Sequence, residues 1–255
     1  LASTYAHSSR MSEASTRRIR VFVEGADDRA TLSVLRKRGL LSRSIEIERK
    51  PKGGVSGMID RLAVWIDPTG VANNAIAVRD FDDLDRKKAV EQLARHLRNK
   101  LPKAVRIEAA PDGVRAISGT RQTTVHLACA GLPSNAKLIR RFSIRRFAID
   151  DFVVLLAIDP DVYPSCRQLR ETDFARAMAA LDRCVAALAK SGISISVSKK
   201  ILHLLCAITD VRASPATVCK RVVEDAFGAA GKAKVGSLFA PLIVPIESAV
   251  KKLSD

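Results

Sequence analysis

The stretch IAVRDFDDLD, residues 76–85, decides the fold. It is a run of small apolar residues that ends in Asp80, and three more carboxylates follow before residue 86. A short apolar run of this kind, bounded by polar residues, is typical of a buried strand in a parallel sheet. A second run, RIRVFVEG at residues 18–25, ends in the same manner at Glu24 and Gly25.

Strands and helices alternate around these two runs. We expect strands at residues 18–25, 44–48, 74–80, 105–109, 114–117 and 123–130, and helices over residues 27–39, around Met58, Leu62 and Trp65 with Ser56 as N-cap, and up to Leu101. Strands that alternate with helices predict an α/β fold with a mostly parallel sheet flanked by helices and joined by right-handed crossovers.

The rest of the chain has the helical period alone. The segment TDFARAMAALDRCVAALAKSG, residues 172–192, carries an apolar seam, and Ser198 and Ser214 are placed to cap two further helices. We therefore predict a disordered tail over residues 1–16, with Met11 as a candidate start, an α/β domain over residues 17–147, and a helical C-terminal region over residues 148–255.

The composition indicates a polyanionic partner. The chain holds 43 Lys and Arg against 27 Asp and Glu, a net charge of +16, and we expect it to bind nucleic acid, either DNA or RNA. A basic surface that only aids solubility is the alternative. The cysteines form no CxxC pair, which favours a reducing cytoplasm. No secretory signal and no run of 18 apolar residues is found, so no membrane span is predicted.

The strand ends predict a metal site. The carboxyl ends of parallel strands share one edge of the sheet, so Glu24 and Asp80 should meet there, with Asp82 two residues further along the loop. Carboxylates crowded in this way repel one another, and Mg²⁺ or Mn²⁺ bound by their oxygens removes the repulsion. Alternatively these acids form turns, and Asp83 and Asp85 cap the following helix.

The motifs VFVEGADD (residues 21–28) and IAVRDFDD (residues 76–83) together resemble the Toprim domain, and the resemblance covers residues 17–130. It implies that Asp80 and Asp82 hold Mg²⁺ and that Glu24 is a general acid/base or a further ligand. The glycine that often follows this motif is absent, because Asp83 and later Asp85 stand there.

A second segment extends the resemblance. FAIDDFVVLL, residues 147–156, resembles the acidic and apolar segment that follows the core of small Toprim proteins, which would make Asp151 an additional ligand. The alternative places Asp150 and Asp151 at a helix N-terminus, where acids are favoured by the helix dipole.

Candidate contacts to nucleic acid lie outside these motifs. IRRFSIRRF, residues 139–147, interleaves Arg140, Arg141, Arg145 and Arg146 with Phe142 and Phe147, a pattern suited to a phosphate backbone and stacked bases. An amphipathic element with its apolar residues inward is the alternative. Arg79 is expected to pair with a carboxylate or reach a phosphate, and Lys52 lies in the glycine-rich loop KPKGGVSG.

The expected function is a Mg²⁺-dependent nuclease or phosphodiesterase of the Toprim-like kind. The alternative is a non-catalytic nucleic-acid-binding or regulatory protein on the same scaffold, or a subunit of a defence or repair complex. As such a subunit, the protein would use its helical C-terminal region as a surface for a protein partner or a second copy; the alternative is that this region simply packs on the sheet. The chain has no GxxxxGK[ST] motif, and its two tyrosines, Tyr5 and Tyr163, make a strand-passage nucleophile unexpected.

Overall fold

A six-stranded sheet forms the centre of the molecule. The computed structural model describes residues 19–51, 53–66, 74–80, 85–131 and 136–254. The strands β1 (Ile19–Val23), β2 (Ile45–Ile47), β3 (Ala75–Asp80), β4 (Arg106–Ala110), β5 (Gly113–Ser118) and β6 (Arg121–Ala130) lie in the order β2-β1-β3-β6-β5-β4. The pairs β2-β1, β1-β3 and β3-β6 are parallel, and β5 is antiparallel to both of its neighbours.

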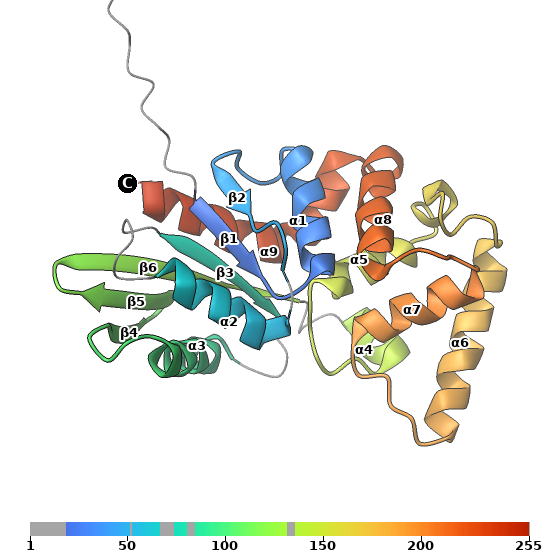
Figure 1. Cartoon of the computed structure of the whole chain (residues 1–255). Helices are drawn as coiled ribbons and strands as arrows, with labels where there is room; N and C mark the ends of the chain where they lie inside the picture. Colours follow the sequence, from blue (N-terminus) through green and yellow to red (C-terminus); the bar gives the residue numbers. More distant parts are fainter. Residues whose placement is uncertain (1–18, 52, 67–73, 81–84, 132–135, 255) are drawn as a thin grey trace, which may run out of the picture.

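The predicted fold class is confirmed: the protein is α/β, with a mostly parallel sheet flanked by helices and a helical C-terminal region. The helices α1 (Ala26–Lys37), α2 (Gly54–Trp65) and α3 (Arg86–Lys100) connect the first strands. Side chains alternate between the two faces of a strand, and Phe22 of β1 accordingly packs with α2 and α3, whereas Val21 and Val23 join α1 on the other face. Figure 1 shows these two layers.

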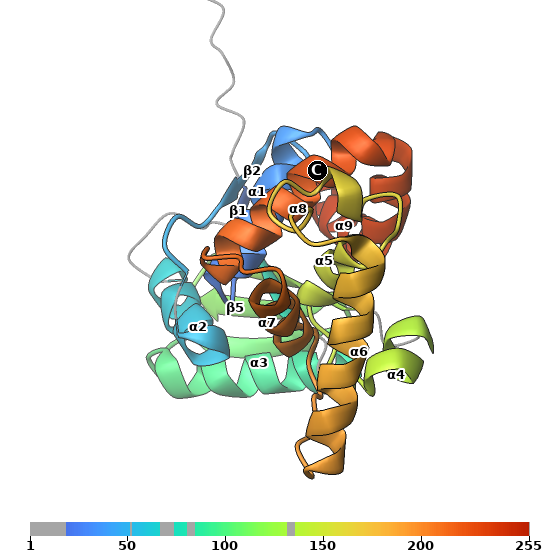
Figure 2. The same ribbon diagram turned by 90° about the vertical axis from the view of Figure 1, so that its right-hand side faces the viewer.

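The C-terminal helices extend the α1 side of the sheet. They are α4 (Ala136–Phe142), α5 (Asp150–Ala157), α6 (Phe174–Lys190), α7 (Ser198–Ile208), α8 (Pro215–Ala229) and α9 (Gly231–Ser254), with a short 3-10 helix η1 (Tyr163–Ser165) after α5. Helix α5 lies at their centre, and its Phe152 stacks on Phe239 of α9 with ring centroids 4.9 Å apart. One hydrophobic cluster runs from β1 through α1 to α5, α8 and α9 (Figure 2).

Of the three serines predicted to cap helices, one is confirmed and two are wrong. Ser214 caps α8 by accepting a hydrogen bond from the Thr217 N–H (3.3 Å). Ser56 lies inside α2, which begins earlier because Gly53 takes a left-handed conformation (φ 81°) that glycine adopts without strain. Ser198 is the first residue of α7 and not its cap, because its hydroxyl donates to Asp151.

Helix α9 lies within the predicted helical C-terminal region, although its bounds were not predicted, and it contains Pro241 and Pro245. By length and composition alone, Gly231–Leu253 is long and apolar enough to cross a membrane, a test that core helices also pass. Its buried side chains recur every three or four residues on one face, which packs into the hydrophobic cluster: Val235, Phe239, Leu242 and Ile246.

Candidate active site: an acidic cluster at the sheet edge

Glu24 and Asp80 meet at the carboxyl ends of β1 and β3. These neighbouring strands are in parallel register, with Val23 opposite Val78. The Asp80 backbone N–H donates a hydrogen bond to Glu24 Oε1 (3.1 Å). The structure therefore brings together Glu24 and Asp80, two of the four predicted metal ligands, which are 56 residues apart in the chain. Of the other two, Asp82 lies outside the described residues, and Asp151 lies in the first turn of α5.

The first turn of α1 adds two acids that the sequence analysis did not assign to the site. Asp27 and Asp28 are the last two residues of the motif VFVEGADD, and each residue is only 8% exposed. Asp28 accepts a hydrogen bond from the Gly25 N–H (2.8 Å), which closes the start of the helix. The pair of aspartates in VFVEGADD was the available signal, but it fitted an ordinary helix N-terminus equally well.

The first turn of α5 adds Asp150 and Asp151, so both lie at a helix N-terminus as the alternative expected, and the role of Asp151 as an additional ligand stays a prediction. Both residues are buried. The turn is joined to β3, because the Ile149 N–H donates to Asp80 Oδ1 (3.3 Å). Asp151 accepts hydrogen bonds from the Ala148 N–H (3.1 Å) and from the Ser198 hydroxyl of α7.

These six residues are called the acidic cluster below: Glu24, Asp27, Asp28, Asp80, Asp150 and Asp151. Burial, with the negative charges of Asp28, Glu24 and Asp150, raises the pKa of Asp80 from its ordinary value of 3.8 to about 9. Burial and the charge of Asp150 raise the pKa of Asp28 to about 7. Burial and the charge of Asp27 raise that of Asp150 to about 6. The cluster therefore holds protons at neutral pH unless a cation takes their place.

Two basic side chains already face the acidic cluster. Lys199 of α7 donates to Asp27, and although burial lowers the pKa of Lys199, the bond to Asp27 and its charge outweigh that effect and raise it. The Nε atom of Arg79 lies 3.9 Å from Glu24 Oε1, and its Nη2 atom donates to Gln92 (3.0 Å). Of the two predicted roles of Arg79, the structure shows the pairing with a carboxylate.

A thiol completes the surroundings of Asp150. The Cys219 Sγ atom of α8 lies 3.8 Å from Asp150 Oδ1 and donates to it. Burial raises the pKa of the Cys219 thiol, so it stays protonated. Helices α5, α7 and α8 thus all contribute polar contacts to this edge, where the sequence analysis expected only Asp151 from outside the α/β part.

The fit to a metal ion rests on the chemistry of these donors. Carboxylate oxygens are the ligands that Mg²⁺ and Mn²⁺ prefer, and burial, followed by the charges of neighbouring carboxylates, raises the pKa of Asp80. Within the part of the chain that the structure describes, no group of three Asp, Glu, His or Cys side chains is arranged to hold a metal ion. The described donors are Glu24 and Asp80, and a site built on them needs Asp82 or another donor.

The arginine-rich segment has its apolar residues inside. Phe142 is only 1% exposed and belongs to the hydrophobic cluster, so it does not offer a ring for stacking. Arg141 forms an ion pair with Asp182 (3.0 Å), and the other three predicted contacts in the segment are exposed: Arg140, Arg145 and Arg146. The amphipathic arrangement is therefore correct for Phe142. Lys52 lies outside the described residues.

Comparison with known proteins found no matching family model, no matching curated protein and no matching solved structure. The functional argument for this chain therefore starts from the geometry of the acidic cluster and from the distribution of its charge.

Proposed function

We propose that the protein is a divalent-cation-dependent phosphodiesterase of the Toprim-like kind that acts on nucleic acid. The observation that carries the proposal is the hydrogen-bonded juxtaposition of Glu24 and Asp80 at the carboxyl edge of the parallel strands. In α/β sheets this edge is where ligands bind. Asp80 and Asp82, with Glu24, would hold Mg²⁺ or Mn²⁺.

The protonation of Asp80 supports a cation at this edge. With a pKa of about 9, its carboxyl group holds a proton at pH 7, and a divalent cation would replace that proton because it binds the ionised form. When bound, such an ion neutralises charge on a phosphodiester and lowers the pKa of bound water. The Asp80 N–H fixes the orientation of the Glu24 carboxylate, which suits Glu24 to hold the ion or to accept a proton from the attacking water.

The substrate class follows from charge. An excess of 16 positive charges favours a polyanion, and the acidic cluster needs a cation before a phosphate can approach it. Both requirements are met by a nucleic acid, DNA or RNA, that brings its phosphates to a cation-loaded site. The prediction of cytoplasmic location is compatible with this substrate and stays a prediction.

The test combines cleavage with cation binding. Labelled single- and double-stranded DNA and RNA are incubated with Mg²⁺ or Mn²⁺ and wild type, Asp80→Asn, Asp82→Asn or Glu24→Gln. Each variant should lose at least about 100-fold of the cleavage rate, since removal of a charge-stabilising group typically costs about that much or more. Mn²⁺ should raise the melting temperature of wild type but not of Asp80→Asn, a readout that does not depend on activity.

Asp85→Asn is the matched control. Asp85 caps α3 by accepting from the Lys88 N–H (2.8 Å), its side chain is 59% exposed, and it lies five residues beyond Asp80. Asparagine caps helices as well as aspartate does, so this variant should cleave as wild type does. If wild type cleaves and Asp80→Asn cleaves equally well, the assignment of the site is wrong.

A second candidate is a non-catalytic nucleic-acid-binding protein, or a complex subunit, on the same scaffold. Lys199 already donates to Asp27, and the described residues include no group of three metal ligands. Under this alternative the acidic cluster holds helices together, and the exposed apolar residues Ile193 and Val244 belong to a surface for a protein partner or a second copy. Salt-sensitive binding without cleavage on any of the four substrates would favour it.

A further inference from the structure

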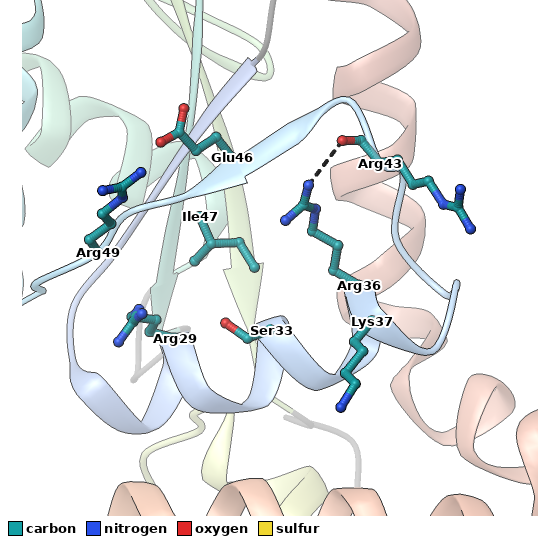
Figure 3. Close-up of a pocket in the computed structure, with 8 residues that line it drawn as sticks. All are labelled: Arg29, Ser33, Arg36, Lys37, Arg43, Glu46, Ile47 and Arg49. Carbon is teal, nitrogen blue, oxygen red and sulfur yellow. Dashed lines mark hydrogen bonds between the residues drawn. The ribbon is translucent and has the colours of Figure 1, made fainter.

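A groove lined by basic side chains runs between α1 and the edge strand β2. We call it the basic groove; it has a volume of about 560 Å³ and is lined by Arg29, Ser33, Arg36, Lys37, Arg43, Glu46, Ile47 and Arg49. Figure 3 shows the side chains of α1 on one wall and those of β2 and its flanking residues on the other. Five cations and one carboxylate line it, so an anion is the ligand that its charge favours.

The α1 wall is a regular face of the helix. Arg29, Ser33, Arg36 and Lys37 follow the spacing i, i+4, i+7, i+8, which places side chains on one side of a helix. Arg29 and Lys37 are exposed, and with a rise of about 1.5 Å per residue they stand about 12 Å apart along the axis. That length spans about four successive phosphates of a nucleic-acid strand, which are spaced about 3.4 Å along the duplex axis.

The positive charges of the basic groove are not neutralised by ion pairs within the described part of the chain. Among the described residues, none of its five Lys or Arg side chains forms an ion pair with an acid. Arg36 is held in place because its Nη2 atom donates to the Arg43 backbone oxygen (3.2 Å). Its Nε atom is buried and has no hydrogen-bond partner in the described structure.

The basic groove starts at the edge that carries the acidic cluster. Arg29 directly follows Asp28 in the first turn of α1. Arg49 lies just beyond β2, whose carboxyl end faces the same way as those of β1 and β3 because all three are parallel. A ligand that lies along the groove would therefore reach towards Glu24 and Asp80.

We infer that the basic groove binds the phosphate backbone of a nucleic-acid strand and guides it towards the acidic cluster. The guidance rests on the proposed function, whereas the binding does not. An elongated row of cations along α1 fits a chain of phosphates better than a single phosphate group. This site differs from the arginine-rich segment at residues 139–147, which lies on α4 and the residues after it.

The test measures binding in EDTA, so that it is independent of cation-dependent cleavage. Fluorescence anisotropy with a labelled 30-mer, as single-stranded DNA, duplex DNA or single-stranded RNA, is recorded from low to high salt. The variant Arg29→Gln, Arg43→Gln, Arg49→Gln should bind at least about tenfold more weakly at 0.1 M salt. Its slope of log affinity against log salt should fall by about 2 to 3, since each phosphate contact contributes about 0.9 on duplex DNA.

A control variant removes the same charge elsewhere. Lys103→Gln, Arg115→Gln, Lys251→Gln changes three exposed side chains outside the basic groove, and its affinity should stay within about threefold of wild type because it loses no phosphate contact. An equal loss in both variants would mean that net charge alone acts, and this would overturn the inference. So would a groove variant that binds as wild type does.

Two further measurements distinguish nucleic acid from other ligands that carry phosphate. Inorganic phosphate and ATP at millimolar concentration should fail to displace the 30-mer, and vesicles of phosphatidylserine should not distinguish the groove variant from the control variant. Displacement by ATP, or a groove-dependent loss only on vesicles, would overturn the inference. If binding depends on the groove but wild type cleaves nothing, the proposed function alone is refuted. If cleavage depends on Asp80 but the groove variant binds nucleic acid as wild type does, the inference alone is refuted.

Discussion

Helix α1 contributes charged side chains to both the acidic cluster and the basic groove; those in the cluster are buried, whereas Arg29 and Lys37 in the groove are exposed. Asp27 and Asp28, in the first turn of α1, are buried and linked to other polar groups. Arg29 and Lys37 of the same helix are exposed and form no ion pair among the described residues. The acids are therefore tied to the stability of the fold, whereas the bases remain available to a ligand. Substitutions in the two regions should separate these properties.

Asp151→Ala should have the largest effect on stability. Asp151 is fully buried and accepts from the Ser198 hydroxyl and the Ala148 N–H. Its loss leaves both donors unsatisfied, and the free energy of unfolding should fall by about 2–4 kcal/mol. Urea denaturation measures this value. Asp182→Ala, which removes a half-exposed acid paired with Arg141, is the control and should cost about 0–1 kcal/mol.

Asp80→Asn should raise stability at high pH. Because the pKa of Asp80 rises from 3.8 unfolded to about 9 folded, the folded protein holds a proton between these values that the unfolded chain releases. Stability in EDTA should therefore fall as pH rises from about 4 to 9. Asparagine carries no such proton and still offers an oxygen to the Ile149 N–H. The variant should gain about 1–3 kcal/mol at pH 8.

Denaturation of wild type and Asp80→Asn at pH 5, 7 and 9 checks this prediction. Asp28 and Asp150, whose pKa values are raised to about 7 and about 6, contribute a dependence of the same sign at lower pH, so the variant should show a weaker dependence and not a flat one. Identical pH profiles of the two proteins would show that Asp80 is ionised in the folded state.

Lys199→Met should lower the free energy of unfolding by a smaller amount, about 1–2 kcal/mol. The Lys199 side chain is 48% exposed, so solvent screens part of its interaction with Asp27. The change leaves Asp27 without its donor and removes a positive charge that lowers the pKa of Asp150, so the loss should grow as pH rises and Asp150 ionises. Lys200→Met is the control, since the neighbouring Lys200 is also exposed on the first turn of α7. Equal melting temperatures for the two variants would show that Lys199 contributes nothing to the acidic cluster.

The groove variant Arg29→Gln, Arg43→Gln, Arg49→Gln should have the smallest effect on stability. These side chains are exposed, and surface substitutions usually change the free energy of unfolding by about 0.5 kcal/mol or less each. A melting temperature within a few degrees of wild type would show that the basic groove, unlike the acidic cluster, contributes little to stability. A loss of stability as large as that of Asp151→Ala would show that the two regions do not differ in this respect.

The sheet and the meeting of Glu24 with Asp80 could be predicted because both depend on local patterns. Alternation of strands and helices fixes the direction of β1 and β3, and parallel strands bring their last residues to one edge. The helix start at Asp150 could be read in the same manner. These features need only the sequence of each element and the rule for connecting them.

The other features of the fold and of the two sites depend on tertiary contacts, which no local sequence pattern predicts. Asp27 and Asp28 have the spacing of an exposed helix N-terminus, but α8 packs against α1 and Lys199 of α7 donates to Asp27, so both acids are buried. Arg29, Arg43 and Arg49 are spread over 21 residues and share a groove only because β2 pairs with β1 beside α1. The course of α9 through Pro241 and Pro245 is likewise maintained by packing of its apolar face.

The shortness of β2 bears on the solubility of the protein. An edge strand exposes backbone groups that can pair with the edge of another molecule and start aggregation. Here the strand has only three residues, and Arg43 and Arg49 lie on either side of it. Two copies aligned edge to edge would bring these like charges together, so the arginines of the basic groove also keep molecules apart. A polyanion that neutralises them removes this protection, and colloidal stability and ligand binding therefore depend on the same side chains.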